Sequence, residues 1–278
     1  MSAEADLTPL AAQPGPSTLE YHDEAFPGRP LLLHAARPAG WHPGMPVLLV
    51  HHGVARNGGD YRDYWMPHGE GILVIAIEFP QTSFPEYLCY NFGNLHAADG
   101  TPHPRERWTY GIGPRLFRRL LAQGLTTVPR YGLFGHSAGG QYVHRMLSFG
   151  YRDHVAVAIS ANAGTYAMPD LSIDWPWGLG SVPTDDLAPI LSFPLTIMAG
   201  TEDTKITGRF FPKGPKSMRQ GPNRFARAHA YFQRGQQAAA TLGIRCAWRL
   251  IEVPGVGHDG RRMSDAAATV VRHALLGH

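Results

Sequence analysis

Ser137 stands in a setting that can turn a serine hydroxyl into a nucleophile. It is the central residue of Gly135-His-Ser-Ala-Gly139, which follows the apolar run YGLF and precedes a segment with a helical pattern. A serine at a sharp strand-to-helix turn exposes its hydroxyl above the sheet, and small neighbours such as Ala138 permit such a turn. Backbone N–H groups at the start of the helix would lie near an oxyanion formed on an attacked carbonyl group. Because glycine and serine are also common in ordinary turns, this interpretation needs a base and an acid elsewhere in the chain.

A suitable acid and base follow Ser137 in the order that a strand–turn–helix nucleophile requires. The run LTIMAG is followed by TEDTK, which contains Asp203, and the run AWRLIEV is followed by PGVGHDG, which contains His258. Both runs are predicted strands, and the catalytic groups of open α/β sheets gather at the carboxyl ends of strands. The position in the loop favours Asp203 over its neighbour Glu202 as the acid. We therefore predict a catalytic triad of Ser137, Asp203 and His258.

A backbone donor for the oxyanion is expected from the loop after the strand VLLV. The sequence HHGVARNGG follows this strand, and the N–H of Val54 is predicted to face the same oxyanion as the N–H of Ala138. Arg56 and Asn57, in the same loop, are predicted either to orient the loop or to contact the substrate.

These residues need a scaffold that brings several loops to one edge of a sheet. Runs bounded by glycine and proline predict strands near residues 18–24, 29–37, 45–53, 71–79, 130–137, 154–160, 195–200 and 247–253. Helical patterns lie between them near residues 60–70, 114–124, 138–150, 223–243 and 263–277. This alternation predicts an α/β fold with a mostly parallel sheet covered by helices on both faces. The first two strands have no helix between them and are predicted to form an antiparallel edge.

The domain organisation follows from length and composition. A chain of 278 residues that is 44% apolar can bury the core of one large domain. Residues 1–17 are rich in alanine and proline and are predicted to form a flexible leader. Residues 18–278 are predicted to form a single domain.

Two long segments interrupt the alternation of strands and helices. Residues 80–112 and 162–190 are rich in aromatic residues, proline and glycine, and loops of this length in a compact domain are usually functional. Both follow predicted carboxyl strand ends, so we expect them to fold over the active site and to favour small esters. Four of their residues are predicted to line the substrate pocket: Tyr90, Asn91, Asn162 and Gly164.

The motifs together resemble those of the α/β-hydrolase superfamily, and within it bacterial esterases related to poly(3-hydroxybutyrate) depolymerase and feruloyl esterase. The similarity is found in HHGVARNGGDYRDYW, YNFGNL, GHSAGGQYVHR, SANAGTYAMPD, AGTEDT and VPGVGH, from about residue 45 onward. It implies an α/β-hydrolase fold with Ser137 as nucleophile, Asp203 as triad acid and His258 as base, and with Val54 and Ala138 as oxyanion donors. The chain differs from secreted depolymerases because it has no evident export signal and no polymer-binding module, which argues against a polymer as substrate.

Composition argues against several other classes of protein. The net charge of +3 is small and the arginines are scattered, so no nucleic-acid partner is expected. Cys89 and Cys246 lie far apart without a C-x-x-C motif, which predicts free thiols. His51 and His52 are adjacent, but no carboxylate or cysteine completes a ligand set, so neither a metal nor any other cofactor is predicted.

Nothing in the sequence indicates a membrane partner. The first residues include acids and lack a long apolar core, and the strongest apolar run, ILVIAIEF, is too short to span a bilayer. We therefore expect a cytoplasmic protein whose partner is a small-molecule ester. The sequence does not indicate an oligomeric state.

The leading functional hypothesis is a serine hydrolase that cleaves small or short-acyl carboxylic esters through an acyl-enzyme. A depolymerase of polyesters or oligoesters, or an acyltransferase, would use the same three residues. A non-enzymatic alternative is a binding protein with a hydrolase fold, against which the intact triad argues. His136 and His144 flank the nucleophile and are interpreted as packing residues.

Overall fold

A central sheet organises the protein, as seen in a computed structural model that describes residues 5–184 and 186–277. Its strands, in chain order, are β1 (Gly15–Tyr21), β2 (Leu31–Arg37), β3 (Val47–His51), β4 (Leu73–Glu78), β5 (Tyr131–His136), β6 (Val155–Ala161), β7 (Leu195–Gly200) and β8 (Arg249–Val253). They form one sheet in the order β1-β2-β4-β3-β5-β6-β7-β8. β2 pairs antiparallel with β1 and β4, and the remaining neighbours pair in parallel. The predicted mostly parallel sheet with an antiparallel edge is confirmed.

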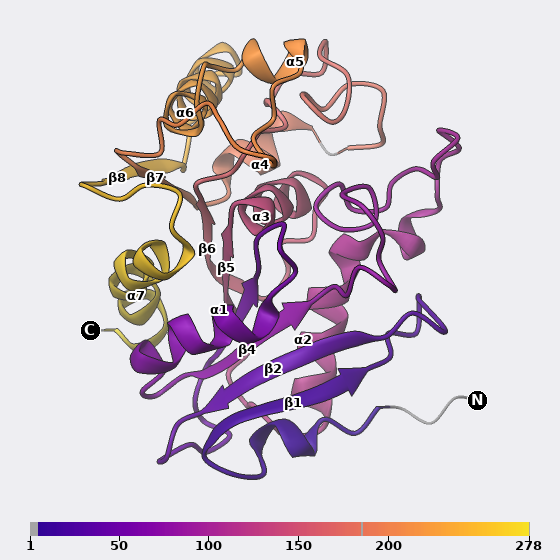
Figure 1. Cartoon of the computed structure of the whole chain (residues 1–278), viewed down its shortest axis with the longest axis vertical. Coiled ribbons are helices and arrows are strands. Elements are labelled where there is room, and N and C mark those ends of the chain that lie inside the picture. Colours follow the sequence, from indigo (N-terminus) through magenta and orange to yellow (C-terminus); the bar gives the residue numbers. More distant parts are fainter. Residues whose placement is uncertain (1–4, 185, 278) are drawn as a thin grey trace.

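Helices cover both faces of this sheet (Figure 1). The α-helices are α1 (Gly58–Trp65), α2 (Ile112–Ala122), α3 (Ala138–Ser148), α4 (Leu187–Ser192), α5 (Pro215–Met218), α6 (Arg224–Thr241) and α7 (Gly260–Leu276). The 3-10 helices are η1 (Thr8–Ala11), η2 (Met66–His68), η3 (Arg105–Arg107) and η4 (Thr109–Gly111). Buried side chains of α1 and α7 pack on one face, and those of α2, α3 and α6 pack on the other.

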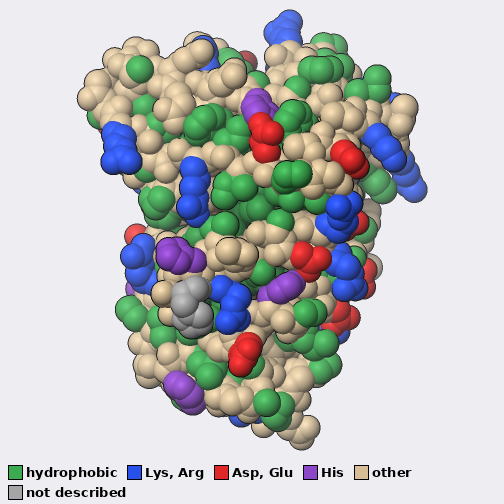
Figure 2. All heavy atoms as spheres, turned by 90° about the vertical axis from the view of Figure 1, so that its left-hand side faces the viewer, with side chains coloured by type: hydrophobic (Ala, Val, Ile, Leu, Met, Phe, Trp, Pro, Cys, Tyr) green, Lys and Arg blue, Asp and Glu red, His purple; other side chains and the backbone are tan. Residues whose placement is uncertain are grey.

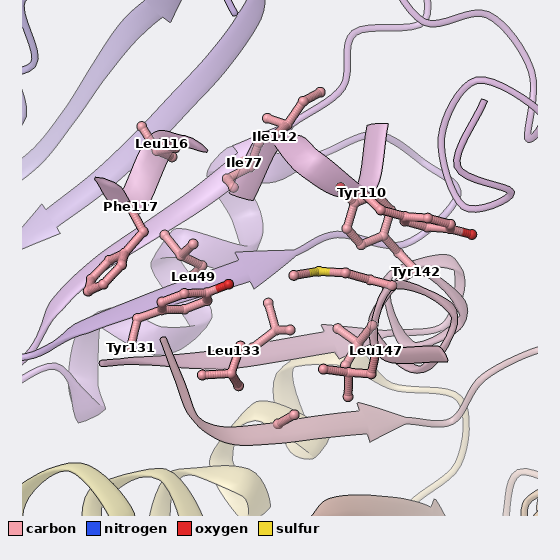
Figure 3. Packing of buried hydrophobic residues seen from close by; sticks show 14 of the residues in the cluster. Leu49, Ile77, Tyr110, Ile112, Leu116, Phe117, Tyr131, Leu133, Tyr142 and Leu147 are labelled. Atoms are coloured by element: carbon pink, nitrogen blue, oxygen red, sulfur yellow. The ribbon is translucent and has the colours of Figure 1, made fainter. Parts of the chain in front are cut away.

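The larger core lies between the sheet and α2 and α3. Figure 3 shows Leu116 and Phe117 of α2 on one side, facing Leu49 of β3 and Leu133 of β5. These side chains are fully buried because β3 and β5 are central parallel strands, covered on both faces and apolar along almost their whole length. Tyr142 from α3 extends this core toward the carboxyl ends of the strands. The core therefore fixes the strand ends from which the site residues emerge.

The N-terminal segment differs from the predicted flexible leader. Residues 8–11 form η1, and β1 begins at Gly15, within the range assigned to the leader. Leu7 and Leu10 are buried in the larger core, which gives this segment apolar contacts that its alanine- and proline-rich composition did not indicate. Residues 1–4 of the predicted leader lie outside the described residues.

The surface is mixed in charge. On the face shown in Figure 2, Lys and Arg side chains are scattered among Asp and Glu, with apolar side chains between them.

Among the described residues, no helix is both long enough and apolar enough to cross a bilayer.

Candidate active site

Ser137 occupies a strained turn between β5 and α3. Its φ of 58° and ψ of −114° lie in a region that residues with a side chain rarely adopt. The turn requires very close backbone approaches: a Cβ on Gly135 would lie 2.2 Å from the Gly139 oxygen, and one on Gly139 would lie 2.1 Å from the His51 oxygen. Glycine at these two positions is therefore a steric requirement of the turn. The turn places the Ser137 hydroxyl at the carboxyl edge of the sheet.

Ser137, His258 and Asp203 form one chain of hydrogen bonds. Nε2 of His258 lies 2.9 Å from Oγ of Ser137, and Nδ1 of His258 lies 2.7 Å from Oδ2 of Asp203. Since an ionised carboxylate only accepts, Nδ1 donates to Asp203, which leaves the lone pair of Nε2 to accept the serine proton. Asp203 is buried, with 1% of its surface exposed, whereas Glu202 is exposed. The structure thus brings together the three residues that the sequence predicts as a triad.

Backbone contacts hold the acid and base loops together at the ends of β7 and β8. Asn162, after β6, accepts from the Gly200 N–H at 2.8 Å and donates to the Gly257 oxygen at 2.9 Å. The Thr201 and Glu202 N–H groups donate to the carbonyl oxygens of Val253 and Val256. These bonds couple the segment that carries Asp203 to the segment that carries His258.

Two side chains support the triad from outside it. Nη1 of Arg224 lies 3.4 Å from Oδ1 of Asp203, the carboxylate oxygen that His258 leaves free. His136 packs beside His258 with ring centroids 4.8 Å apart, and its Nδ1 lies 2.7 Å from the Tyr61 hydroxyl. Burial holds the pKa of His136 well below its usual value, and the neighbouring His258 adds to this shift. His136 is therefore a neutral packing partner of His258 rather than a second base.

The loop after β3 lies beside Ser137. Val54 and Ala138 both line the pocket that contains Ser137, and no hydrogen bond among the described residues uses either of their N–H groups. His52 anchors this loop, because its Nε2 accepts from the Phe79 N–H and its Nδ1 lies 2.7 Å from the Gly53 oxygen. Two free N–H groups next to a serine hydroxyl can receive an oxyanion.

The pocket at Ser137 has a volume of about 440 Å³. Aromatic side chains and a few polar groups form its wall, which is typical of sites for small molecules. Its lining comprises Val54, Tyr87, Asn91, Phe92, Ser137, Ala138, Gln141, Gly164, Thr165, Trp177, Arg209, Phe210, Phe211, Pro212, Gly214, Ser217 and Arg224.

The predicted substrate-binding residues are divided between this wall and the interior. Asn91 and Gly164 line the pocket. Tyr90 is fully buried and its hydroxyl donates to the His52 oxygen at 2.7 Å, so it supports the loop after β3 from the protein interior. Asn57 precedes α1 without a capping hydrogen bond from its side chain, and its Nδ2 donates to Oδ2 of Asp60 at 2.7 Å, outside the pocket lining. Asn162 is 1% exposed and its side chain is used by the bonds to Gly200 and Gly257.

Several lining residues were not identified from the sequence. Gln141 lies one helical turn after Ser137 on α3 and so was identifiable from helical spacing. Arg209, Phe210 and Phe211 belong to an irregular segment between β7 and α6, where no period indicates which side chains face inward. Arg224 begins α6 and reaches Asp203 from a distant part of the chain.

A buried arginine connects both long loops to α3. Nη1 of Arg145 donates to the Asn91 oxygen in the first loop and to Gln141 on its own helix. Its Nη2 donates to Thr165 and to the Pro176 oxygen in the second loop. Arg145 therefore fixes both loops to α3, beside the pocket.

The histidines and cysteines considered above as possible metal ligands or bases are engaged in packing and hydrogen bonds or are free thiols. His51 is fully buried and stacks on Tyr142 at 4.1 Å, and burial lowers its pKa to about 3. His144 accepts from the Ala167 N–H. Cys89 and Cys246 are free thiols, as predicted. Among the described residues, no group of three or more His, Cys, Asp or Glu could hold a metal ion.

Searches with protein-family models and among curated proteins give no match. Among solved structures, poly(aspartic acid) hydrolase-1 from Sphingomonas sp. KT-1 is 36% identical, with a TM-score of 0.89 over 93% of this chain and 99% of that one. LpqC, a poly(3-hydroxybutyrate) depolymerase from Bordetella parapertussis, is 37% identical, with a TM-score of 0.89 over 98% of this chain and 96% of that one.

More distant structures have the same fold. An S-formylglutathione hydrolase from Agrobacterium tumefaciens is 16% identical, with a TM-score of 0.60 over 94% of this chain and 95% of that one. The predicted α/β-hydrolase fold is thus confirmed, as is the resemblance to esterases related to poly(3-hydroxybutyrate) depolymerase. The chain belongs to the α/β-hydrolase family that includes LpqC and poly(aspartic acid) hydrolase-1.

Proposed function

We propose that the protein is a serine hydrolase that cleaves carboxylic esters through an acyl-enzyme intermediate. The observation that carries this proposal is the hydrogen-bond chain from Asp203 through His258 to Ser137, which ends at a pocket large enough for a small substrate. Membership of a family of hydrolases supports the same reaction class.

In the first half of the reaction, Nε2 of neutral His258 takes the proton from Oγ of Ser137 as Oγ attacks the ester carbonyl carbon. The negative charge that forms on the carbonyl oxygen is received by the N–H groups of Val54 and Ala138. Asp203 stabilises the imidazolium, which then gives its proton to the departing alkoxide oxygen. The alcohol leaves, and the acyl group remains esterified to Ser137.

In the second half, a water molecule replaces the alcohol. His258 takes a proton from this water as its oxygen attacks the acyl carbon, and the same two N–H groups receive the second oxyanion. The proton then returns from His258 to Oγ of Ser137 as the acyl–oxygen bond breaks. The carboxylic acid leaves and the starting enzyme is restored, with no cofactor needed at any step.

The pocket dimensions favour compact esters with short acyl chains. Each methylene that finds room adds roughly 0.8 kcal/mol of binding free energy, whereas one that meets the wall loses this gain through a clash. Phe211 and Trp177 form part of the wall near Ser137, and both loops are held in place by Arg145. We therefore propose that kcat/KM is highest for short acyl chains.

An oligomeric ester is the second candidate, and one observation favours it. A neighbouring pocket of about 430 Å³ shares Trp177 with the pocket at Ser137, so an extended chain could cross this side chain from one pocket to the other. Both close relatives are named for polymeric substrates.

Hydrolysis of 4-nitrophenyl esters from acetate to palmitate tests the proposal, with insoluble poly(3-hydroxybutyrate) as the polymer arm. We expect kcat/KM to peak among short chains, and Ser137→Ala to lower kcat by about three to six orders of magnitude. A profile that rises through palmitate, or release of monomers from the polymer with poor turnover of butyrate, would support the oligomeric substrate instead. Unchanged activity in Ser137→Ala would refute the proposed mechanism.

A further inference from the structure

Among the described residues, the lining of the pocket at Ser137 contains two arginines and no carboxylate of its own. Arg209 and Arg224 are part of its lining, and no described lining residue is Asp or Glu. Asp203, outside this lining, accepts from His258 through Oδ2 and faces Nη1 of Arg224 through Oδ1 at 3.4 Å, so one carboxylate is shared between His258 and Arg224. A buried charge is ordinarily paired, because removing an ion from water costs several kcal/mol or more.

Arg224 is only partly satisfied by the protein. It is 7% exposed, and among the described residues its one hydrogen bond joins Nη1 to Oδ1 of Asp203 at the long distance of 3.4 Å. Its Nε is buried without a hydrogen-bond partner, and no hydrogen bond among the described residues uses Nη2. Burial lowers the pKa of this guanidinium, an effect that the charge of Asp203 only partly offsets.

Two further arginines lie behind the pocket wall, and among the described residues neither forms an ion pair with a carboxylate. Arg227 donates to the carbonyl oxygens of Gly164, Pro212 and Gly221, and Arg145 donates only to carbonyl, amide and hydroxyl oxygens. Burial lowers the pKa of Arg227 to about 10, and repulsion from Arg224 adds to the shift. A negative charge placed in the pocket would relieve this repulsion and the incomplete solvation of Arg224.

We propose that the substrate carries a carboxylate in addition to its scissile bond, and that the guanidinium of Arg224 binds this carboxylate inside the pocket, with Arg209 at the mouth. A guanidinium can bind a carboxylate through two parallel hydrogen bonds, which combine charge with a defined orientation. The substrate class is therefore a half-ester of a dicarboxylic acid or an ester whose alcohol part bears a carboxylate. The inference rests on the proposed function of Ser137, since it describes what that serine acts on.

The test uses substrate pairs that differ only in charge. Mono-4-nitrophenyl glutarate and adipate, compared with their methyl-capped neutral counterparts, place the carboxylate in the acyl part. The butyrate ester of 4-hydroxybenzoate, compared with that of methyl 4-hydroxybenzoate, places it in the alcohol part. After subtraction of spontaneous hydrolysis, we expect the charged member of one pair to have a kcat/KM about ten- to one-hundredfold higher than its neutral partner.

Variants assign the preference to Arg224. Arg224 also contacts Asp203, so Arg224→Gln can lower activity toward every substrate, but such an effect cancels in the charged-to-neutral ratio. We expect Arg224→Gln to bring this ratio near unity and Arg224→Lys to retain part of the preference. Lys213→Gln removes an exposed charge from the same segment, outside the pocket lining, and is expected to keep the wild-type ratio.

Two results would overturn the inference: equal kcat/KM within every pair for the wild-type protein, or an unchanged ratio in Arg224→Gln. Should Arg224→Gln fail to fold, two other measurements decide. Arg209→Gln must lower the charged-to-neutral ratio of kcat/KM. Free adipate and free glutarate must inhibit the wild-type protein competitively, with Ki values lower than those of the neutral diols of the same chain length. Failure of the proposed function is distinguishable, because it would appear as loss of Ser137-dependent turnover of the neutral esters as well.

Discussion

Asp203 and Glu202 are adjacent carboxylates with different surroundings. Asp203 is buried against His258 and Arg224, whereas Glu202 is exposed and its backbone N–H, rather than its side chain, is used to bind Val256. Asp203, and not Glu202, therefore orients His258, as its position in the loop predicted.

Asp203→Asn is expected to lower kcat by about two to four orders of magnitude, because an amide at this position no longer provides the negative charge that orients and stabilises the His258 imidazolium. Glu202→Gln is the matched control and should have almost no effect. Turnover of 4-nitrophenyl butyrate, with circular dichroism to verify folding, measures both. A larger loss in Glu202→Gln than in Asp203→Asn would move the acid to Glu202.

At the scale of the elements, the turn between β5 and α3 depends on backbone surfaces in contact. A Cβ on Gly139 would lie 2.1 Å from the His51 oxygen, a backbone atom of the central strand β3 that cannot move aside without displacing the sheet. Gly139→Ala should therefore destabilise the protein by more than about 3 kcal/mol or abolish soluble expression.

Gly40→Ala provides the control, since a Cβ there would meet nothing within 4 Å. Urea denaturation compares the free energies of unfolding of both variants with the wild type. If Gly139→Ala were as stable as Gly40→Ala, the backbone of Gly139 would not lie as close to the His51 oxygen as this structure has it.

The elements were largely predictable because apolar patterns reflect burial. Central parallel strands are apolar throughout, and α3, α6 and α7 have helical periodicity, so the order of strands, turns and triad residues could be derived from the chain. The long loops were not predictable in this way. Nothing local distinguishes Asn91, which lines the pocket, from Tyr90, whose hydroxyl points away to the His52 oxygen.

The structure places Asn57, Tyr90 and Asn162 outside the pocket lining for a related reason. Buried backbone groups near the site need hydrogen-bond partners. A polar loop side chain that binds such a backbone group is no longer available to bind a substrate. The side chain of Asn162, for example, binds the Gly200 N–H and the Gly257 carbonyl oxygen. Arg224 was missed because its partner, Asp203, is brought near by the tertiary fold, through an irregular segment that has no sequence period.

At the scale of the whole molecule, buried histidines make stability depend on pH. Burial lowers the pKa of His51 to about 3 and that of His52 to about 4, and it lowers those of His136 and His144 well below the usual value. These residues stay neutral in the folded protein when the unfolded chain takes up protons below its ordinary histidine pKa of about 6.5. Stability is therefore fully present above that pH and falls as the pH decreases toward the folded values.

Between about pH 6.5 and pH 5, His51 and His52 should each remove roughly 2 kcal/mol of stability, because their folded pKa values of about 3 and about 4 lie below this range. Chemical denaturation of the wild-type protein across this range measures the slope. His51→Leu replaces a fully buried ring that has no hydrogen-bond partner among the described residues. In this variant the free energy of unfolding should fall less steeply with decreasing pH, by the contribution of one histidine. Identical slopes for the two proteins would contradict the neutral, buried state of His51.

Covalent labelling with a fluorophosphonate is the most direct test of the central claim, that Ser137 is the nucleophile of a serine hydrolase. Intact-protein mass spectrometry should find one adduct per chain, and peptide mapping should locate it at Ser137. Ser137→Ala should keep the wild-type circular dichroism spectrum and take up no label. Labelling of a different serine, or labelling that persists in Ser137→Ala, would contradict the assignment.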